Sequence, residues 1–184
     1  MSLFNLINLD YKKHQKYGAN FFVIFFLTQG FWAVFQYRIA NFIYVNIKFK
    51  LFRFFFLFIM LLWKKSIEIF TGISIPSSAK IGNAFYIGHF GNIIINPQAV
   101  IGNNCNISQG VTIGISGIGE NRGVPIIGNN VYIGANSVLA GKIIISDNVL
   151  VGACTLVNKS VPENAVVLGV PATIISYYSS KEYL

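Results

Sequence analysis

The sequence has few of the residues that bind metals or form disulfides. It contains two cysteines, Cys105 and Cys154, and two histidines, His14 and His89, among 184 residues. Zinc sites bring three or four such ligands together, and disulfide frameworks have cysteines in larger, even numbers. The shortage therefore predicts reduced thiols and no metal site, and it excludes a zinc centre with three histidine ligands.

Long apolar runs are also missing. In the aromatic-rich first part the longest charge-free apolar run covers residues 54–63, whereas a membrane-spanning helix needs about 20 such residues. No small-residue cleavage site follows the apolar residues 21–27, so this region does not resemble a secretory leader. These absences predict a cytoplasmic protein without a spanning segment.

Charge is scarce and unevenly placed. Residues 1–75 contain nine Lys or Arg against Asp10 and Glu68, and they contain 21 of the 28 aromatic residues. The aromatics lie in apolar runs such as NFFVIFF, not among basic residues in a polar context, so no nucleic-acid partner is expected. Two interpretations stay open. The segment packs as a cap on the rest of the chain, or it also contacts an anionic membrane as a peripheral inner-membrane element.

The same segment contains little that breaks a helix. Helices are expected over residues 30–46 and 48–70, which lack proline. In the first helix, one side at helical spacing would consist of Phe31, Val34, Phe35, Arg38, Phe42 and Val45. Residues 1–20 are polar and mixed, and His14 among them is expected at the surface.

A six-residue period dominates the remainder. Aliphatic residues hold it through one two-residue slip and one longer insertion, at Ile75, Ile81, Ile87, Ile95, Ile101, Ile107, Ile113, Ile127, Ile133, Leu139, Ile145, Val151 and Val157. Four residues after most of them stands a smaller residue such as Ala79 or Cys105, with Phe85 and Ile143 as larger exceptions. Neither a helix nor an alternating strand has this period, which is typical of a solenoid of short parallel strands. These residues are expected to fill its interior, whereas Cys154 should point outward.

The period divides the chain into two parts. Residues 1–71 form the aromatic-rich helical segment, and residues 72–184 form the repeat domain, which Pro76 separates from the helix before it. Eight extra residues lie between Ile113 and Ile127, so a loop over residues 115–125 is expected to leave the solenoid.

His89 is the residue with the clearest chemical potential. It follows Gly88 in HFGNIII, where the repeat slips, and its register points it outward. With NISQGVTIG at residues 106–114 and VVLGVPA at residues 166–172, this motif resembles the hexapeptide-repeat acyltransferases, in particular the serine-acetyltransferase-like enzymes. The resemblance implies a mainly β fold, a left-handed parallel β-helix with an N-terminal α-helical segment.

The resemblance also implies an activity and an assembly. His89 would be the general base of a direct acetyl transfer from acetyl-CoA, without a metal, in a homotrimer with a groove between two chains. Acetyl-CoA would be held by Gly114, Gly134, Ala135, Gly152, Ala153, Lys159, Val170 and Pro171, with Lys142 a second candidate for its phosphates.

Departures from the family pattern bear on the acceptor. Serine acetyltransferases have an acid just before the base and another in the first strand, where this chain has Gly88 and Ser74, and a histidine before a loop proline, where it has Val124. A desolvated ammonium group needs a carboxylate partner. The sequence therefore favours a neutral sugar hydroxyl, as in the O-acetyltransferases of capsule and lipopolysaccharide synthesis. Candidate substrate-binding residues are Ser74, Asn92, Glu120 and Arg122.

Two alternatives stay open. A serine O-acetyltransferase of cysteine biosynthesis would retain the base and the closing motif without the acids. A non-catalytic solenoid scaffold would leave His89 without a role. A γ-class carbonic anhydrase shares the expected fold but needs three zinc-binding histidines, and this chain has two, with His14 outside the repeat.

Overall fold

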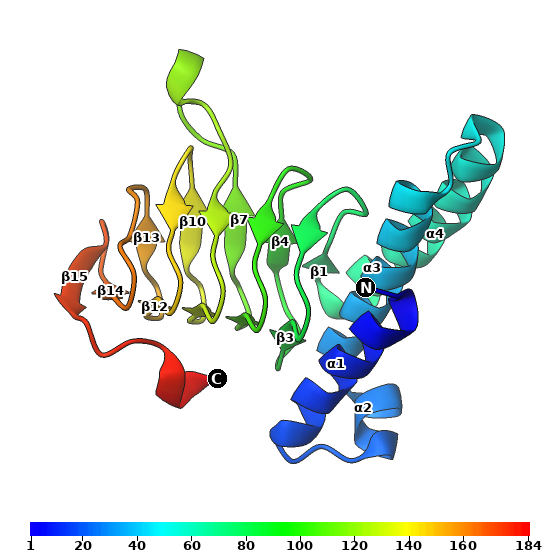
Figure 1. The fold of residues 1–184 in the computed structure, drawn as a ribbon, viewed down its shortest axis with the longest axis horizontal. Helices are drawn as coiled ribbons and strands as arrows, with labels where there is room; N and C mark the ends of the chain where they lie inside the picture. Colours follow the sequence, from blue (N-terminus) through cyan, green and yellow to red (C-terminus); the bar gives the residue numbers. More distant parts are fainter.

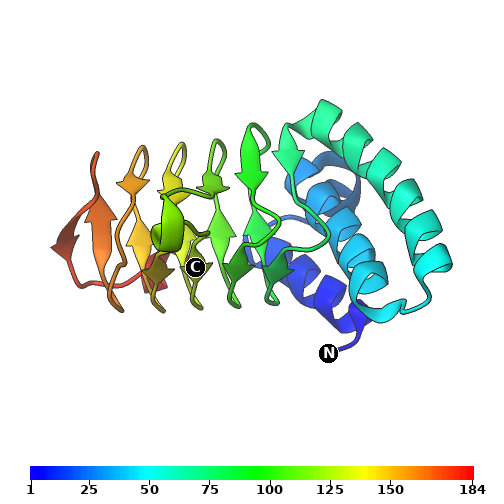
Figure 2. The same ribbon diagram turned by 90° about the horizontal axis from the view of Figure 1, so that it is seen from above.

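The computed structural model describes residues 1–184 as a three-sided prism of parallel strands with four helices at one end (Figures 1 and 2). Sheet A contains β1 (Ile73–Ser74), β4 (Ile93–Ile95), β7 (Thr112–Gly114), β10 (Val138–Ala140) and β13 (Leu156–Val157). Sheet B contains β2 (Lys80–Ile81), β5 (Val100–Ile101), β8 (Ile126–Ile127) and β11 (Ile144–Ile145). Sheet C contains β3 (Tyr86–Ile87), β6 (Asn106–Ile107), β9 (Tyr132–Ile133), β12 (Leu150–Val151), β14 (Val166–Leu168) and β15 (Thr173–Ser176). Each coil passes from A to B to C, which defines the A/B, B/C and C/A corners.

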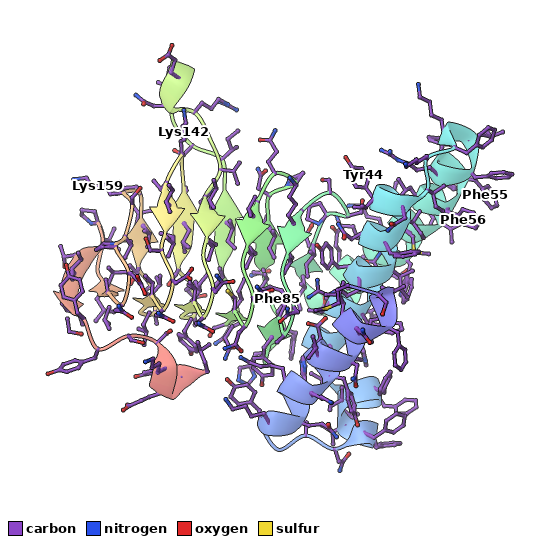
Figure 3. The ribbon with its side chains drawn as sticks, in the orientation of Figure 1. Tyr44, Phe55, Phe56, Phe85, Lys142 and Lys159 are labelled. Carbon is purple, nitrogen blue, oxygen red and sulfur yellow. The ribbon has the colours of Figure 1, made fainter.

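The prism interior consists of the periodic residues. All thirteen aliphatics of the six-residue register are buried, and Phe85, Cys105 and Ile143 are buried with them, as predicted (Figure 3 labels Phe85). Gly91 comes four residues after Ile87, where a smaller interior residue was expected, but it is not in the interior. The two-residue slip places Ile93 there instead and leaves Gly91 in a turn with a φ of 112°. Cys154 is exposed, as expected.

The B/C corner is built on asparagine side chains. Asn104, Asn130, Asn148 and Asn164 each adopt a positive φ there, which asparagine tolerates better than most residues. The amide of Asn104 donates to Asn130 Oδ1 at 2.8 Å, and that of Asn130 donates to Asn148 Oδ1 at 3.0 Å. These bonds form a ladder along the prism axis, which we call the asparagine ladder.

Four helices cover the open end of the prism: α1 (Leu3–Lys16), α2 (Phe21–Leu27), α3 (Gln29–Asn46) and α4 (Lys50–Thr71). The last two agree closely with the predicted helices, whereas α1 and α2 were not predicted. Together the four contain about a third of the residues, so "mainly β" is too narrow a description of the chain.

Helix α3 docks directly on the first coil. A Cβ atom at Gly30 would lie 2.0 Å from the carbonyl oxygen of Ile87, so only glycine permits this approach. The Tyr37 hydroxyl donates to the Ala79 carbonyl at 2.8 Å and accepts the Ile81 N–H at 3.1 Å. These bonds satisfy backbone groups at the end of the stack, which is the task of a cap.

A buried ion pair attaches α1 to α3 and the prism. Arg38 binds the Asp10 carboxylate through two nitrogens, at 2.7 and 3.0 Å, and donates to the carbonyls of Ile81 and Gly82. Asp10 also accepts the Phe85 N–H at 2.9 Å. The pair is almost completely buried, so removing either partner would leave an uncompensated charge in the interior.

His14 is buried, which contradicts the expected surface position. Its Nδ1 lies 2.9 Å from the Asp10 carbonyl oxygen, and its ring packs on Phe31 and Tyr86. The pKa of His14 is lowered, and burial is the largest cause of this shift. The prediction failed because the buried face of α1 is polar, with Asp10, Lys13 and His14 at helical spacing.

Helix α4 and the end of α3 leave many apolar side chains exposed. Phe42 and Val45 are exposed, although the predicted apolar side of the first helix included them, because α3 extends past the prism. None of the four helices alone has both the length and the apolar composition of a membrane span. Helices α2 and α3 taken together have both, with a bend of 77° between them, but α3 is largely buried against the rest of the protein.

The extra residues after β7 form a loop at the A/B corner, as predicted. The loop projects from the prism in Figure 1, contains a short helix η1 (Gly119–Asn121), and is closed by a bridge between Ser116 and Gly123. Ile118 at its tip is 91% exposed. Because the loop leaves between strands, the coils above and below it stay in register.

The C-terminal residues return along sheet C. After β15, which pairs antiparallel with β14, the chain runs back towards the helices and ends in η2 (Lys181–Tyr183) (Figure 1). The Ser180 N–H donates to the Asn148 carbonyl at 3.1 Å, and the Ser180 hydroxyl donates to the Asn130 carbonyl. The terminal Leu184 carbonyl accepts from Lys16 on α1. We call residues 177–184 the tail.

Candidate active site

His89 lies in the C/A corner, in the turn between β3 and β4. Positive φ values at Gly91 and Asn92 shape this turn. The Gly91 N–H donates to the Thr71 carbonyl at the end of α4 at 2.8 Å. The backbone of this turn is therefore held by β3 before it, by β4 after it and by the end of α4. The His89 side chain is exposed, as its register predicted.

A groove of about 800 Å³ connects His89 to the later coils. Its floor follows the C/A corner and contains Gly134, Ala135, Gly152 and Ala153, four of the residues expected to hold acetyl-CoA. A Cβ at Gly152 would lie 1.9 Å from Leu168 Cδ2, and one at Gly134 would lie 2.6 Å from the Ala153 nitrogen. Coil stacking thus requires glycine at Gly134, where the clash would be with backbone, whereas at Gly152 the flexible Leu168 side chain would have to move. The strip of small residues leaves room for a long, narrow ligand.

The tail forms the opposite wall of the groove. Tyr178, Ser179, Glu182 and Tyr183 line it there. The Tyr183 ring packs on Tyr132 with ring centroids 5.1 Å apart, and the Tyr183 carbonyl accepts from Asn106 and Tyr17. This wall could not be predicted, because the tail has no period or motif.

Other residues expected in the site lie elsewhere in this chain. Gly114 is at the end of β7 in sheet A, and Val170 and Pro171 are exposed beyond β14; none of them lines the groove. Lys159 lies at the A/B corner, as does Lys142, on the same side as the projecting loop in Figure 3. Within one chain, these two cations and His89 therefore occupy different corners of the prism.

The expected substrate-binding residues are also divided between corners. Glu120 and Arg122 are exposed on the loop at the A/B corner, where Lys142 donates to the Glu120 carbonyl at 3.2 Å. Asn92 is exposed in the His89 turn. Of the four, only Asn92 and Ser74 lie near His89. Asn92 is in the same turn, and Ser74 in β1 pairs with Ile94 in β4, directly after the turn.

Ser74 has an acidic neighbour that the sequence comparison did not reveal. Its hydroxyl donates to the Glu68 carboxylate at 2.7 Å, and that carboxylate also pairs with Lys64 and Lys65. Partial burial raises the pKa of Glu68, but the hydrogen bonds from Lys65, Ser74 and Lys64 outweigh it and lower the pKa to about 2. A carboxylate thus stands beside the first strand, although it comes from α4 and already has two lysine partners.

Glu182 is the one acidic residue that lines the groove with His89. The other acids are engaged elsewhere: Asp10 with Arg38, Asp147 with Asn129, Glu163 with Asn148, and Glu120 on the loop. Nowhere do three His, Cys, Asp or Glu side chains come close enough to hold a metal ion. The groove therefore combines one imidazole and one carboxylate on a strip of small residues.

Sequence reasoning missed several residues of this groove: Ser108, Gln109, Tyr132, Leu150, Glu182 and Tyr183. Two of them carried a signal. Ser108 and Gln109 belong to NISQGVTIG, and they occupy the same corner as His89, one coil later. For Tyr132 and the tail residues, only the folded coils bring them to the site.

Comparison with known proteins agrees with the repeat. Residues 125–159 match the family described as bacterial transferase hexapeptide (six repeats). A serine acetyltransferase of Staphylococcus epidermidis is 36% identical over 146 residues, which are 79% of this chain and 65% of that protein. The chain therefore spans less than two thirds of this relative's length.

Solved structures show the same likeness over more of the chain. The serine acetyltransferase of Neisseria gonorrhoeae superposes with a TM-score of 0.80 and 27% identity, covering 95% of this chain and 66% of that one. A serine acetyltransferase in complex with CoA superposes with a TM-score of 0.79 and 26% identity, covering 95% of this chain and 70% of that one. Superposition preserves handedness, so the coil has the left hand of that fold family.

These likenesses correct the expected acceptor. The resemblance to sugar O-acetyltransferases of capsule and lipopolysaccharide synthesis is not supported, since the relatives are serine acetyltransferases, and the sugar acceptor was wrong. Two carboxylates, Glu68 beside Ser74 and Glu182 in the groove, come from sequence positions other than those where the family pattern has acids. The repeat, the fold and the relatives together show that this chain is similar to the hexapeptide-repeat acyltransferases, and in particular to the serine acetyltransferases.

Proposed function

We propose that this protein transfers the acetyl group of acetyl-CoA to the hydroxyl of L-serine. The observation that carries the proposal is the groove with His89 at one end, a strip of small residues along its floor and Glu182 in its wall. The serine acetyltransferases that superpose on 95% of the chain support both the donor and the acceptor.

Acetyl-CoA would lie along the small-residue strip. Gly134, Ala135, Gly152 and Ala153 have no bulky side chain, which suits the narrow pantetheine arm of the cofactor. A thioester at the end of that arm would reach the first coils, where His89 projects. A solved serine acetyltransferase that resembles this chain is a complex with CoA, which supports acetyl-CoA as the donor.

His89 would act as a general base. As the serine hydroxyl oxygen attacks the thioester carbonyl carbon, the imidazole takes the hydroxyl proton. The tetrahedral intermediate then collapses, the carbon–sulfur bond breaks, and the imidazolium returns the proton to the leaving thiolate. Histidine is the side chain suited to this exchange near neutral pH.

A covalent acetyl-enzyme is not needed. Burial raises the pKa of Cys105 to about 11, so this thiol inside the prism stays protonated. The exposed Cys154 has no hydrogen-bonded base beside it. Direct transfer between two bound substrates therefore fits the groove better than a two-step route.

Glu182 would bind the ammonium group of serine. A charged ammonium that loses water on binding needs a partner of opposite charge, and Glu182 is the groove's own carboxylate. A second carboxylate, Glu68, lies next to Ser74 but is already paired with two lysines. We therefore assign the recognition of an amino-acid acceptor to the tail.

The proposal is tested by the choice of acceptor. Purified protein with acetyl-CoA is expected to release CoA when L-serine is added, and to form O-acetylserine detectable by mass spectrometry. Sugars with free hydroxyls at the same concentration should leave CoA release at the rate of hydrolysis alone. Equal release with and without L-serine would exclude the proposed acceptor.

We further propose that the active unit is a homotrimer. One chain has His89 and the groove at its C/A corner, and the loop with Glu120 and Arg122 at its A/B corner, where Lys142 and Lys159 also lie. A site between two prisms would bring these two corners together, which a single chain does not do. We expect light scattering to give three times the 20.4 kDa chain mass. A monomer at micromolar concentration would contradict this assembly.

A further inference from the structure

The hairpin of α3 and α4 ends in an unusual surface. Its tip projects beyond the prism end, and Phe55 and Phe56 stand out from it in Figure 3. Near this tip the side chains of Phe49, Leu51, Phe52, Phe54 and Phe55 are between 57% and 72% exposed. We call these five residues the phenylalanine tip. Water-exposed phenylalanines in such number mark an interaction surface.

The exposed residues surround much of the helix. At about 100° per residue, the exposed positions from Leu51 to Phe58 cover an arc of roughly 200° of α4, about twice the stripe that one packed neighbour covers. Helix α3 occupies the remaining side, where the Arg53 guanidinium lies 4.6 Å from the Tyr44 ring centroid. A partner that meets the tip must therefore enclose it, as a fluid apolar medium does and a single helix does not.

The charge around the tip is of one sign. Lys48 and Lys50 are exposed beside it, and no acidic residue occurs between Asp10 and Glu68. Glu68 is itself paired with Lys64 and Lys65 at the other end of α4. A second copy of the same surface would bring like charges together, whereas an anionic surface would complement them.

We propose that the phenylalanine tip inserts into the surface of an anionic lipid bilayer, with Lys48 and Lys50 at the level of the lipid phosphates. The aromatic rings enter the interface, and the lysine side chains extend to its charged layer. The tip enters one leaflet only, because Lys64 and Lys65 end the apolar run of α4. This inference is independent of the proposed reaction.

Vesicle flotation of the full-length protein tests the proposal. The protein is expected to float with phosphatidylcholine vesicles that contain phosphatidylglycerol, and to float far less with phosphatidylcholine alone or at high salt. The double variant Phe54→Ser/Phe55→Ser should reduce the bound fraction at least tenfold. Lys48→Gln/Lys50→Gln should remove the preference for phosphatidylglycerol.

A matched control is available on α2. Phe22 and Phe26 are also exposed phenylalanines, 62% and 57%, but they precede α3, whose 18 residues separate them from the tip by about 27 Å. Phe22→Ser/Phe26→Ser should leave flotation unchanged. Circular dichroism and light scattering should show that every variant keeps the parent fold and mass.

Three outcomes would overturn the proposal. The parent protein could stay soluble with phosphatidylglycerol vesicles at low salt. The α2 variant could lose flotation as strongly as the tip variant, which would indicate unspecific adsorption. The tip variant could keep its flotation but form a smaller assembly, which would show that a second copy covers the tip.

Discussion

Replacing His89 with Ala is expected to lower kcat for acetyl transfer at least ~10²-fold, the lower end of what a general base contributes. The fold should not change, because the His89 side chain is exposed and is not part of the prism interior. KM for acetyl-CoA should change little, since the strip of small residues is untouched. CoA release, followed with a thiol reagent, measures both constants.

Phe90→Ala provides the control for this variant. Phe90 is the next residue in the same turn, is 57% exposed and does not line the groove. It should therefore retain the parent kcat. If His89→Ala also retained it, His89 would not be the base, and the chemistry assigned to the groove would have to be abandoned.

Replacing Glu182 with Gln is expected to raise KM for L-serine roughly 10- to 100-fold. A hydrogen bond to a charged group contributes about 1.5–3 kcal/mol, and about 1.4 kcal/mol corresponds to a factor of ten in affinity. Because the variant keeps the size of the side chain, KM for acetyl-CoA should not change. Steady-state kinetics with each substrate varied in turn separates the two effects.

Glu163→Gln is the matched control for Glu182. Glu163 is an exposed carboxylate that accepts from Asn148 at 3.2 Å and lies outside the groove. This variant should keep the parent KM for L-serine. An unchanged KM in Glu182→Gln would show that the ammonium group is recognised elsewhere, and Glu68 beside Ser74 would become the residue to test.

The prism could be predicted because its determinants are local. Each coil repeats the same six-residue pattern three times, so the thirteen aliphatics identify the interior without knowledge of any distant contact. The loop was predictable for the same reason, since an insertion between Ile113 and Ile127 must leave a closed stack. The outward position of His89 follows from this register too.

The buried face of α1 could not be predicted. Its residues Asp10, Lys13 and His14 are polar, and their burial depends on Arg38, on the Phe85 N–H and on Asn104 Oδ1. All of these partners come from other elements. A helical pattern of apolar residues would have given a signal, but a pattern of paired polar residues does not.

The acceptor was mispredicted for a related reason. The carboxylate in the groove belongs to Glu182, and the carboxylate beside Ser74 belongs to Glu68, so neither occupies the position in the sequence where an acid was sought. A folded site needs a charge at a point in space, and different segments of a chain can provide it. Comparison of motifs alone does not reveal a carboxylate that another segment of the chain brings into the fold.

The path of the tail changes how the repeat should unfold. In a linear stack each coil contacts only its neighbours, so the ends can fray independently. Here the tail leaves the last coil, bonds to the carbonyls of Asn148 and Asn130, and reaches Lys16 on the helical cap. The last coil cannot separate without breaking contacts that cross the earlier coils and end on α1. The tail therefore couples the two ends of the prism, and we expect the solenoid to open as one cooperative unit rather than coil by coil.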